Sequence, residues 1–207
     1  MNELINSEWV RRIRGEVSDE EVASAIRSVP EHRGAATYIV YNSAMATTAA
    51  PVKQPTGNAI RTMMQLRFAT GIRARIIEWG CSFDGSAAAT PGQIELVEVD
   101  VAATMTTAYA AADVQLYNNF GAAQTAGAAG VPLNLSTITS GFATAAVTEG
   151  TTTVSRMADL QMVAPTGQYV HQWPLGREFE VAEQKYLRVR VTFGTSINMW
   201  SYIVFEL

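Results

Sequence analysis

An apolar residue occupies every second position of the segment 187–193, which reads LRVRVTF. Side chains along a β-strand point alternately to its two faces, so a period of two predicts a strand with one apolar face. The segment 60–68, IRTMMQLRF, alternates in the same way over most of its length. No apolar pattern of helical period follows residue 30. These patterns predict an all-β body over residues 36–207.

Three other segments refine this prediction. The segments 72–79 (IRARIIEW) and 94–101 (IELVEVDV) are apolar first on one face and then on the other. Either a β-bulge or partial burial of both faces produces such a switch. The segment 198–205 (NMWSYIVF) is apolar on both faces, which predicts a central strand. Turn sequences such as DG at 84–85 separate the runs, so we expect an antiparallel β-sandwich of jelly-roll type.

Residues 1–35 differ from the rest of the chain and are predicted to form a short helical N-terminal arm. Ser18 begins the sequence SDEE, a capping box completed by Glu21, and Pro30 closes the element. A DNA-binding helix-turn-helix is the alternative, but residues 1–33 carry more acidic than basic side chains, whereas groove-reading modules are usually basic. We therefore expect the arm to dock on its own body or on a neighbouring subunit. Its candidate contact residues are Trp9, Val10, Ile13, Val22 and Ile26.

The segment 101–148 contains a single charged side chain, Asp113, and is rich in Ala, Gly and Thr. We expect a long low-charge loop region over about residues 101–150. Left exposed, such a segment lowers solubility, whereas small side chains lose little rotamer entropy on ordering, and interface cores are depleted in charge. The sequence therefore predicts that this region packs against another protein chain, with Phe120 as a candidate contact.

Residues that carry chemistry are sparse. The two histidines, His32 and His171, lack carboxylates or cysteines at metal-ligand spacing, and no phosphate-binding glycine motif or G-x-S-x-G sequence occurs. The single cysteine, Cys81, is expected to be a small buried residue. Glu95, Glu98 and Asp100 offer carboxylates for a glycosidase, but their spacing does not indicate a catalytic pair. We predict no enzyme activity, no cofactor and no metal.

Charge and hydropathy bear on the partners. The net charge of −4 gives no broad attraction to nucleic acid or acidic lipid. No apolar run reaches the roughly 18 residues of a membrane span, and the sequence MNEL at the start has no basic region before an apolar core, so we expect neither a membrane span nor a signal peptide. We therefore expect protein partners, without direct binding of nucleic acid or membrane.

Two arginine pairs each place two side chains on one strand face, about 7 Å apart. The pairs are Arg73 with Arg75 and Arg188 with Arg190. Such arginines either form a solvated outer face or make bridges to Glu95, Glu98 or a neighbouring subunit. All four are candidate interface residues.

The tryptophans fall into two groups. Trp79 and Trp200 lie within strand patterns, so we expect them to pack in the core. Trp173 is followed by Pro174 in a predicted loop and is the candidate for ligand or partner contact.

Three segments resemble virion proteins of tailed bacteriophages, particularly those of actinobacterial hosts. They are 73–85 (RARIIEWGCSFDG), 174–181 (PLGREFEV) and 187–193 (LRVRVTF), together with the Ala- and Thr-rich middle. The likeness covers roughly residues 37–207. It implies a non-enzymatic capsid decoration or minor capsid protein that binds the major capsid protein or other virion subunits. It further implies a homo-oligomer, with a trimer favoured, that is made in the host cytoplasm and sits on the capsid surface.

Two other functions remain open from the residues alone. One is a tail or head fibre that binds host glycans, with Trp173 as its test position. The other is a secreted carbohydrate-binding module or glycosidase, with Glu95 as its test position. In the capsid hypothesis, residues 1–35 are the anchor on the shell or on a neighbouring subunit.

Overall fold

The computed structural model describes residues 36–45, 50–86, 90–117, 133–151 and 154–207. The chain divides between Ala35 and Ala36 into two units, and the second unit is the body. The predicted helical arm, with Trp9, Val10, Ile13, Val22 and Ile26, lies outside the described residues, as does Phe120. Among the described residues, no helix has the length and apolar character needed to cross a membrane.

The described body consists of β-strands and one short 3-10 turn. The longer strands are β1 (Thr37–Tyr41), β3 (Ile60–Arg67), β4 (Ala74–Phe83), β5 (Gly92–Val99), β9 (Val154–Val163), β10 (Gln168–Gln172), β12 (Tyr186–Thr192) and β13 (Asn198–Glu206). The shorter elements are β2 (Gln54–Pro55), β6 (Thr107–Ala108), the turn η1 (Ala111–Asp113), β7 (Gln115–Leu116), β8 (Gly141–Phe142) and β11 (Phe179–Val181).

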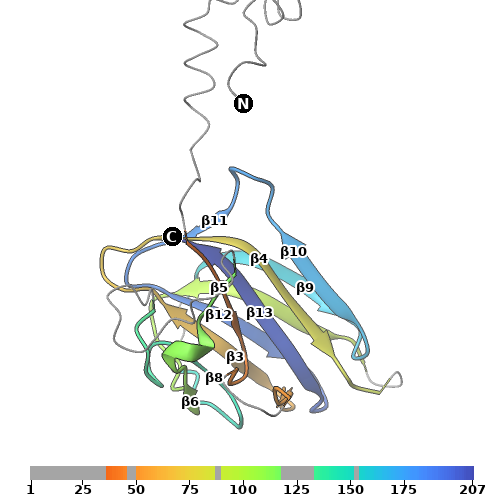
Figure 1. Ribbon diagram of the computed structural model, residues 1–207. Coiled ribbons are helices and arrows are strands. Elements are labelled where there is room, and N and C mark those ends of the chain that lie inside the picture. Colours follow the sequence, from red (N-terminus) through yellow and green to blue (C-terminus); the bar gives the residue numbers. More distant parts are fainter. Residues whose placement is uncertain (1–35, 46–49, 87–89, 118–132, 152–153) are drawn as a thin grey trace, which may run out of the picture. The chain divides into compact units, whose positions relative to one another are not determined.

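The strands form two sheets that pack face to face (Figure 1). Sheet A has the order β10-β4-β13-β1-β7, with β11 beside β4 and β2 beside β13, and sheet B has the order β6-β8-β3-β12-β5-β9. All pairings between these strands are antiparallel. Among the eight longer strands the first pairs with the last, the second with the seventh, the third with the sixth and the fourth with the fifth, alternately in sheets A and B. This is jelly-roll connectivity, so the predicted fold class is confirmed.

The two segments that switch faces do so for different reasons. In β4, Glu78 pairs with Val204 and Ile76 pairs with Phe205, which leaves Ile77 as an extra residue in a bulge. This bulge lets Ile76 and Trp79 both reach the core. β5 keeps a continuous register with β12 and is buried on both faces, and its register shifts against β9 leave the extra residues on β9. Each of the two expected explanations therefore applies to one strand.

The core lies between the two sheets and is built on large apolar side chains. Trp79, Phe68 and Phe205 are completely or almost completely buried, and the Phe68 and Phe205 rings meet edge to face with centroids 5.2 Å apart. Burying each such side chain contributes roughly 1.5–3 kcal/mol to stability. The prediction of a core position is confirmed for Trp79 and is wrong for Trp200, which is 42% exposed.

The described parts of the low-charge segment 101–148 pack against the body of their own chain. Tyr109, Val114 and Phe142 belong to the main core cluster. The amide of Gln65, on the outer face of β3, accepts from the Ala103 backbone N–H at 2.8 Å and donates to its carbonyl oxygen at 3.3 Å. For these residues the prediction that another chain covers the segment is therefore wrong. Small side chains let the segment lie close to its own sandwich, which removes its apolar surface from water.

Candidate functional site

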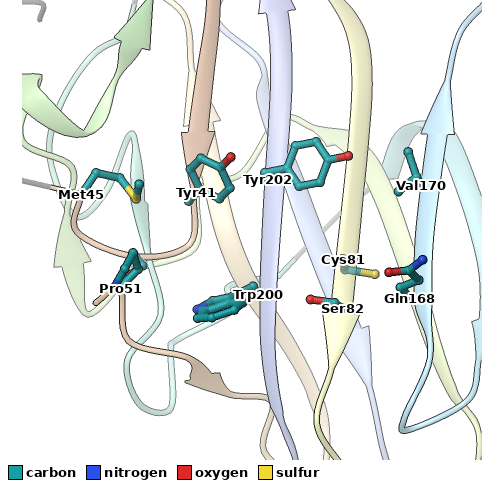
Figure 2. Close-up of a pocket in the computed structure, with 10 residues that line it drawn as sticks. Tyr41, Met45, Pro51, Cys81, Ser82, Gln168, Val170, Trp200 and Tyr202 are labelled. Atoms are coloured by element: carbon teal, nitrogen blue, oxygen red, sulfur yellow. The ribbon is translucent and has the colours of Figure 1, made fainter. Parts of the chain in front are cut away.

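A groove lies on the outer face of sheet A, with a cavity of about 410 Å³ (Figure 2). We call it the aromatic groove. Its apolar lining consists of Tyr41, Met45, Pro51, Val170, Trp200 and Tyr202. Its polar lining consists of Ser43, Ser82 and Gln168, and Cys81 also lines it. Figure 2 shows that these side chains come from β1, β4, β10 and β13 and from the chain that follows β1.

The groove forms because β13 carries apolar side chains on both of its faces. β13 lies between β4 and β1, as the apolar pattern of the segment 198–205 predicts for a central strand. Its residues Met199, Ile203 and Phe205 belong to the core, whereas Trp200 and Tyr202 point to the opposite face. No described strand covers that opposite face, and this is why the second apolar face of β13 becomes a surface feature.

A glycine fixes the position of the Tyr202 ring. Tyr202 pairs across the sheet with Gly80 of β4 and Tyr41 of β1. A Cβ atom on Gly80 would lie 2.7 Å from Cε1 of Tyr202 and 2.9 Å from the backbone oxygen of Tyr169, so only glycine leaves room for the ring here. The Tyr202 hydroxyl donates a hydrogen bond to Oε1 of Glu78, which holds the other end of the ring.

The groove carries no ionised side chain among its described lining residues. Burial raises the pKa of Tyr202, and its hydrogen bond to Glu78 raises it further, so the hydroxyl stays a proton donor at neutral pH. Burial also raises the pKa of Cys81 to about 12, so its thiol is not a nucleophile at neutral pH. This agrees with the prediction that Cys81 is a small buried residue, since it is 3% exposed.

A polar cluster around Asp159 of β9 joins the edge strands of the two sheets, β9 and β10. Its Oδ2 accepts from the Tyr169 hydroxyl at 2.7 Å and from Nε1 of Trp79 at 3.1 Å, and it lies 2.8 Å from Nδ1 of His171. Burial opposes ionisation of Asp159, but the hydrogen bonds from Tyr169, Trp79 and Gln161 and the neighbouring His171 outweigh it and lower its pKa. The cluster ties β10 to β9 across one side of the sandwich.

The sequence did not predict this cluster, because His171 was considered there only as a metal ligand. Tyr169, His171 and Trp173 recur at every second position, so they share one strand face, and that period is a signal for it. Their partner Asp159 lies on a strand of the other sheet and carries no local signal. No group of three or more potential metal-ligating side chains occurs among the residues that the structure describes.

The candidate arginines separate into buried and exposed residues. Nε of Arg190 forms an ion pair with Oε1 of Glu95 at 2.6 Å, which confirms the predicted bridge, although both side chains are almost fully buried. Arg188 is completely buried and donates to Oε1 of Gln65 at 3.0 Å. Arg188 and Arg190 are therefore unavailable to a partner, and their prediction as interface residues is wrong. The backbone oxygens of Val101 and Glu149, in segments that return over sheet B, lie against Arg188.

The other candidate interface residues that the structure describes lie nearer to the solvent. Arg73 is exposed and pairs with Glu180 at 3.0 Å, and Arg75 is half-buried. Trp173 is half-buried, with its ring centroid 4.4 Å from that of His171 and 6.4 Å from that of Phe179. The aromatic groove contains none of these three residues.

The carboxylates of β5 do not form a catalytic pair. Glu95 lies opposite Arg190 and Glu98 lies opposite Leu187 of β12, which places the two carboxylates on opposite faces of the sheet. Glu98 instead binds Arg156, whose Nη2 lies 2.6 Å from its Oε2.

Comparisons with known proteins identify no relative: no family model, no curated protein and no solved structure matches the chain. Its function is therefore inferred from its own sequence, fold and surface.

Proposed function

We propose that this chain is a non-enzymatic structural component of a tailed-phage particle, a capsid decoration or minor capsid protein. It binds the head shell, through the major capsid protein or another virion subunit, with the aromatic groove on sheet A. The observation that carries this proposal is an uncharged groove in which Trp200 stands 42% exposed beside Tyr41 and Tyr202.

The composition of the groove supports a protein partner. Interface cores are enriched in Trp, Tyr and Met and depleted in charge, and hot spots are enriched in Trp and Tyr. Trp200 and Val170 expose large apolar area on one face, at 42% and 54%. Contiguous apolar surface of this kind marks interaction sites on soluble proteins.

The fold and the segment resemblance agree with this proposal. Jelly rolls occur in viral capsid proteins and in lectins, although a fold by itself does not fix a function. The segment 73–85, which carries part of the resemblance to phage virion proteins, supplies the β4 floor of the groove, including Gly80, Cys81 and Ser82. We propose a homo-oligomer, with a trimer favoured, on the capsid surface.

The polar groups of the groove favour protein over glycan. Sugar binding needs several free polar groups beside an aromatic platform, and besides its aromatic residues the groove offers Ser43, Ser82 and Gln168, while the Tyr202 hydroxyl is already bound to Glu78. The Ser43 hydroxyl is already engaged by the backbone N–H of Val52 at 3.1 Å. A glycan-binding fibre role is therefore the less favoured outcome of the test.

The test uses purified heads of the phage that encodes the chain. We expect the protein to sediment with heads that lack it, and Trp200→Ala to weaken this binding by about thirtyfold, because truncating a hot-spot tryptophan costs about 2 kcal/mol. Met162→Ala is the matched control, since Met162 is 67% exposed on β9 of the other sheet.

Equal binding of wild type and Trp200→Ala would exclude the groove as the docking site. Absence of the protein from intact particles, measured by mass spectrometry and imaging, would exclude the structural role. Trp200-dependent binding to a glycan array, without binding to heads, would favour the fibre function.

A further inference from the structure

The free edges of the two sheets differ in how well they resist pairing with another strand. In the described body the sheets end on β6 and β7, with two residues each, and on β9 and β10, and the short strand β11 continues the β10 edge along β4. β9 is interrupted by two register shifts and carries the inward carboxylate of Asp159, which are protective devices of edge strands. β10 pairs with β4 without any register shift, and its sequence QYVHQ contains neither lysine nor proline.

The backbone of β10 presents unpaired groups along its outer edge. The carbonyl of Gly167 accepts from the N–H of Phe83, and the N–H of Trp173 donates to the carbonyl of Ile77. The backbone N–H and C=O groups of the odd-numbered residues between them therefore point toward β4. Hydrogen-bonding directions alternate along a strand. The N–H and C=O groups of Gln168, Val170 and Gln172 therefore point away from β4, where the described part of the chain pairs no strand with them. Figure 1 shows β10 at this margin beside β4.

The same residues connect this edge to the aromatic groove. Gln168 and Val170 line the groove, and Val170 lies opposite Gly80 in the register of β10 and β4 (Figure 2). A strand added beside β10 places every second side chain on the groove side of the sheet, because strand side chains alternate between faces. Backbone pairing with β10 and contact of a side chain with the β10 end of the groove are therefore available to one extended segment.

The charge of the groove specifies the occupant. A charged side chain entering a groove without ionised lining residues loses hydration and gains no partner, which costs free energy. An aliphatic or other apolar side chain on a strand beside β10 instead contacts Val170, which lines the groove at its β10 end.

We propose that β10 accepts an extended, uncharged segment of a partner chain as an additional strand of sheet A, and that an apolar side chain of this segment packs against Val170 at the β10 end of the aromatic groove. This inference rests on the proposed function, because the partner is the virion subunit to which the protein docks. It specifies the form of the partner: a strand rather than a helix, a charged tail or a sugar.

The test titrates the full-length protein with a short blocked peptide of alternating threonine and valine and follows backbone amide signals by NMR. We expect the largest shifts at Gln168, Val170 and Gln172 of β10. N-methylation of the peptide amides along one edge should abolish binding, whereas N-methylation along the other edge should not. If both N-methylated peptides still bind, or if the shifts are confined to other strands, the proposal is overturned.

A variant pair adds an independent readout. Val170→Lys places a charge on the free edge, and we expect it to weaken peptide binding at least tenfold. Met162→Lys places the same charge on β9 and should leave peptide binding unchanged. Both positions are exposed, at 54% and 67%, so neither substitution disturbs the core. Equal peptide affinity of wild type and Val170→Lys would overturn strand addition.

The two proposals fail in different ways. Heads that bind Val170→Lys as well as wild type would overturn strand addition while leaving the docking function intact. Peptide binding at β10 with no binding to heads would overturn the docking function alone. Shifts at Trp200 with an oligosaccharide and none with the peptide would overturn strand addition in favour of a glycan.

Discussion

At the scale of single residues, Asp159 is the clearest case of a polar group whose role is structural. It is 9% exposed, yet Trp79, Tyr169 and His171 contact one of its carboxylate oxygens. These partners outweigh the cost of burial and lower its pKa. The carboxylate therefore favours the folded state when it is ionised.

The pH dependence of stability follows from this lowered pKa. A folded pKa below the unfolded value, roughly 3.9, gives stability that is present above that value and is lost as the pH falls through the folded pKa. At pH 7 we expect Asp159→Asn to lower the free energy of unfolding by about 1–3 kcal/mol, because its buried partners lose a charged acceptor. Urea unfolding at several pH values measures this difference, which should shrink in acid. A constant difference would contradict the assignment.

Gly80 gives a second prediction at this scale. Gly80→Ala should destabilise the protein by about 1–3 kcal/mol, because the new Cβ would displace the Tyr202 ring or β10. Gly194→Ala is the matched control, since a Cβ there meets nothing within 4 Å. Thermal unfolding compares the two variants, and equal melting temperatures would show that the close contact at Gly80 is readily relieved.

At the scale of elements, β12 combines an apolar face with a buried arginine. Arg188 donates to Gln65 and to the backbone oxygens of Val101 and Glu149, so it joins sheet B to the segments that cover it. Burial lowers the pKa of Arg188 to about 10, which still leaves it protonated at neutral pH. The charged guanidinium of Arg188 therefore takes part in the packing of β12 against the segments that cover it.

Removal of this charge should be costly. We expect Arg188→Met to lower the free energy of unfolding by about 3–5 kcal/mol, because it leaves buried polar partners without their donor. Arg73→Met removes an exposed ion pair with Glu180 and should cost at most about 1 kcal/mol. Denaturant unfolding of both variants checks the contrast. Similar costs would mean that water replaces the guanidinium of Arg188.

At the scale of the whole molecule, the sandwich is complete within residues 36–207. The N–H of Leu207 donates to the carbonyl of Ala36, so the first and last described residues of the body are hydrogen-bonded to each other. We expect a chain that begins at Ala36 to keep its β-type circular dichroism and cooperative unfolding. In the capsid hypothesis it should bind heads less well, because residues 1–35 are the proposed anchor. Full binding by the shortened chain would exclude that anchor.

The packing of the low-charge segment changes the basis for an oligomer. Its residues Tyr109, Val114 and Phe142 are buried in their own chain, so the proposed trimer depends on exposed surfaces such as the aromatic groove. Light scattering on the purified protein should give a mass of three chains that does not change on dilution. A single-chain mass would contradict a trimer of the isolated protein.

The sequence by itself determined the strands, because a period of two records which side chains share a face. It therefore predicted the sandwich, the central position of β13 and the change of face in β4. It did not distinguish Trp79 from Trp200, or Arg188 from Arg73, since both members of each pair occupy similar local patterns. Only the tertiary structure decided which strand faces are covered, because the covering segments come from distant parts of the chain. Trp79 is likewise distant from Asp159, and its nearer partners Tyr169 and His171 lie on a strand of the other sheet.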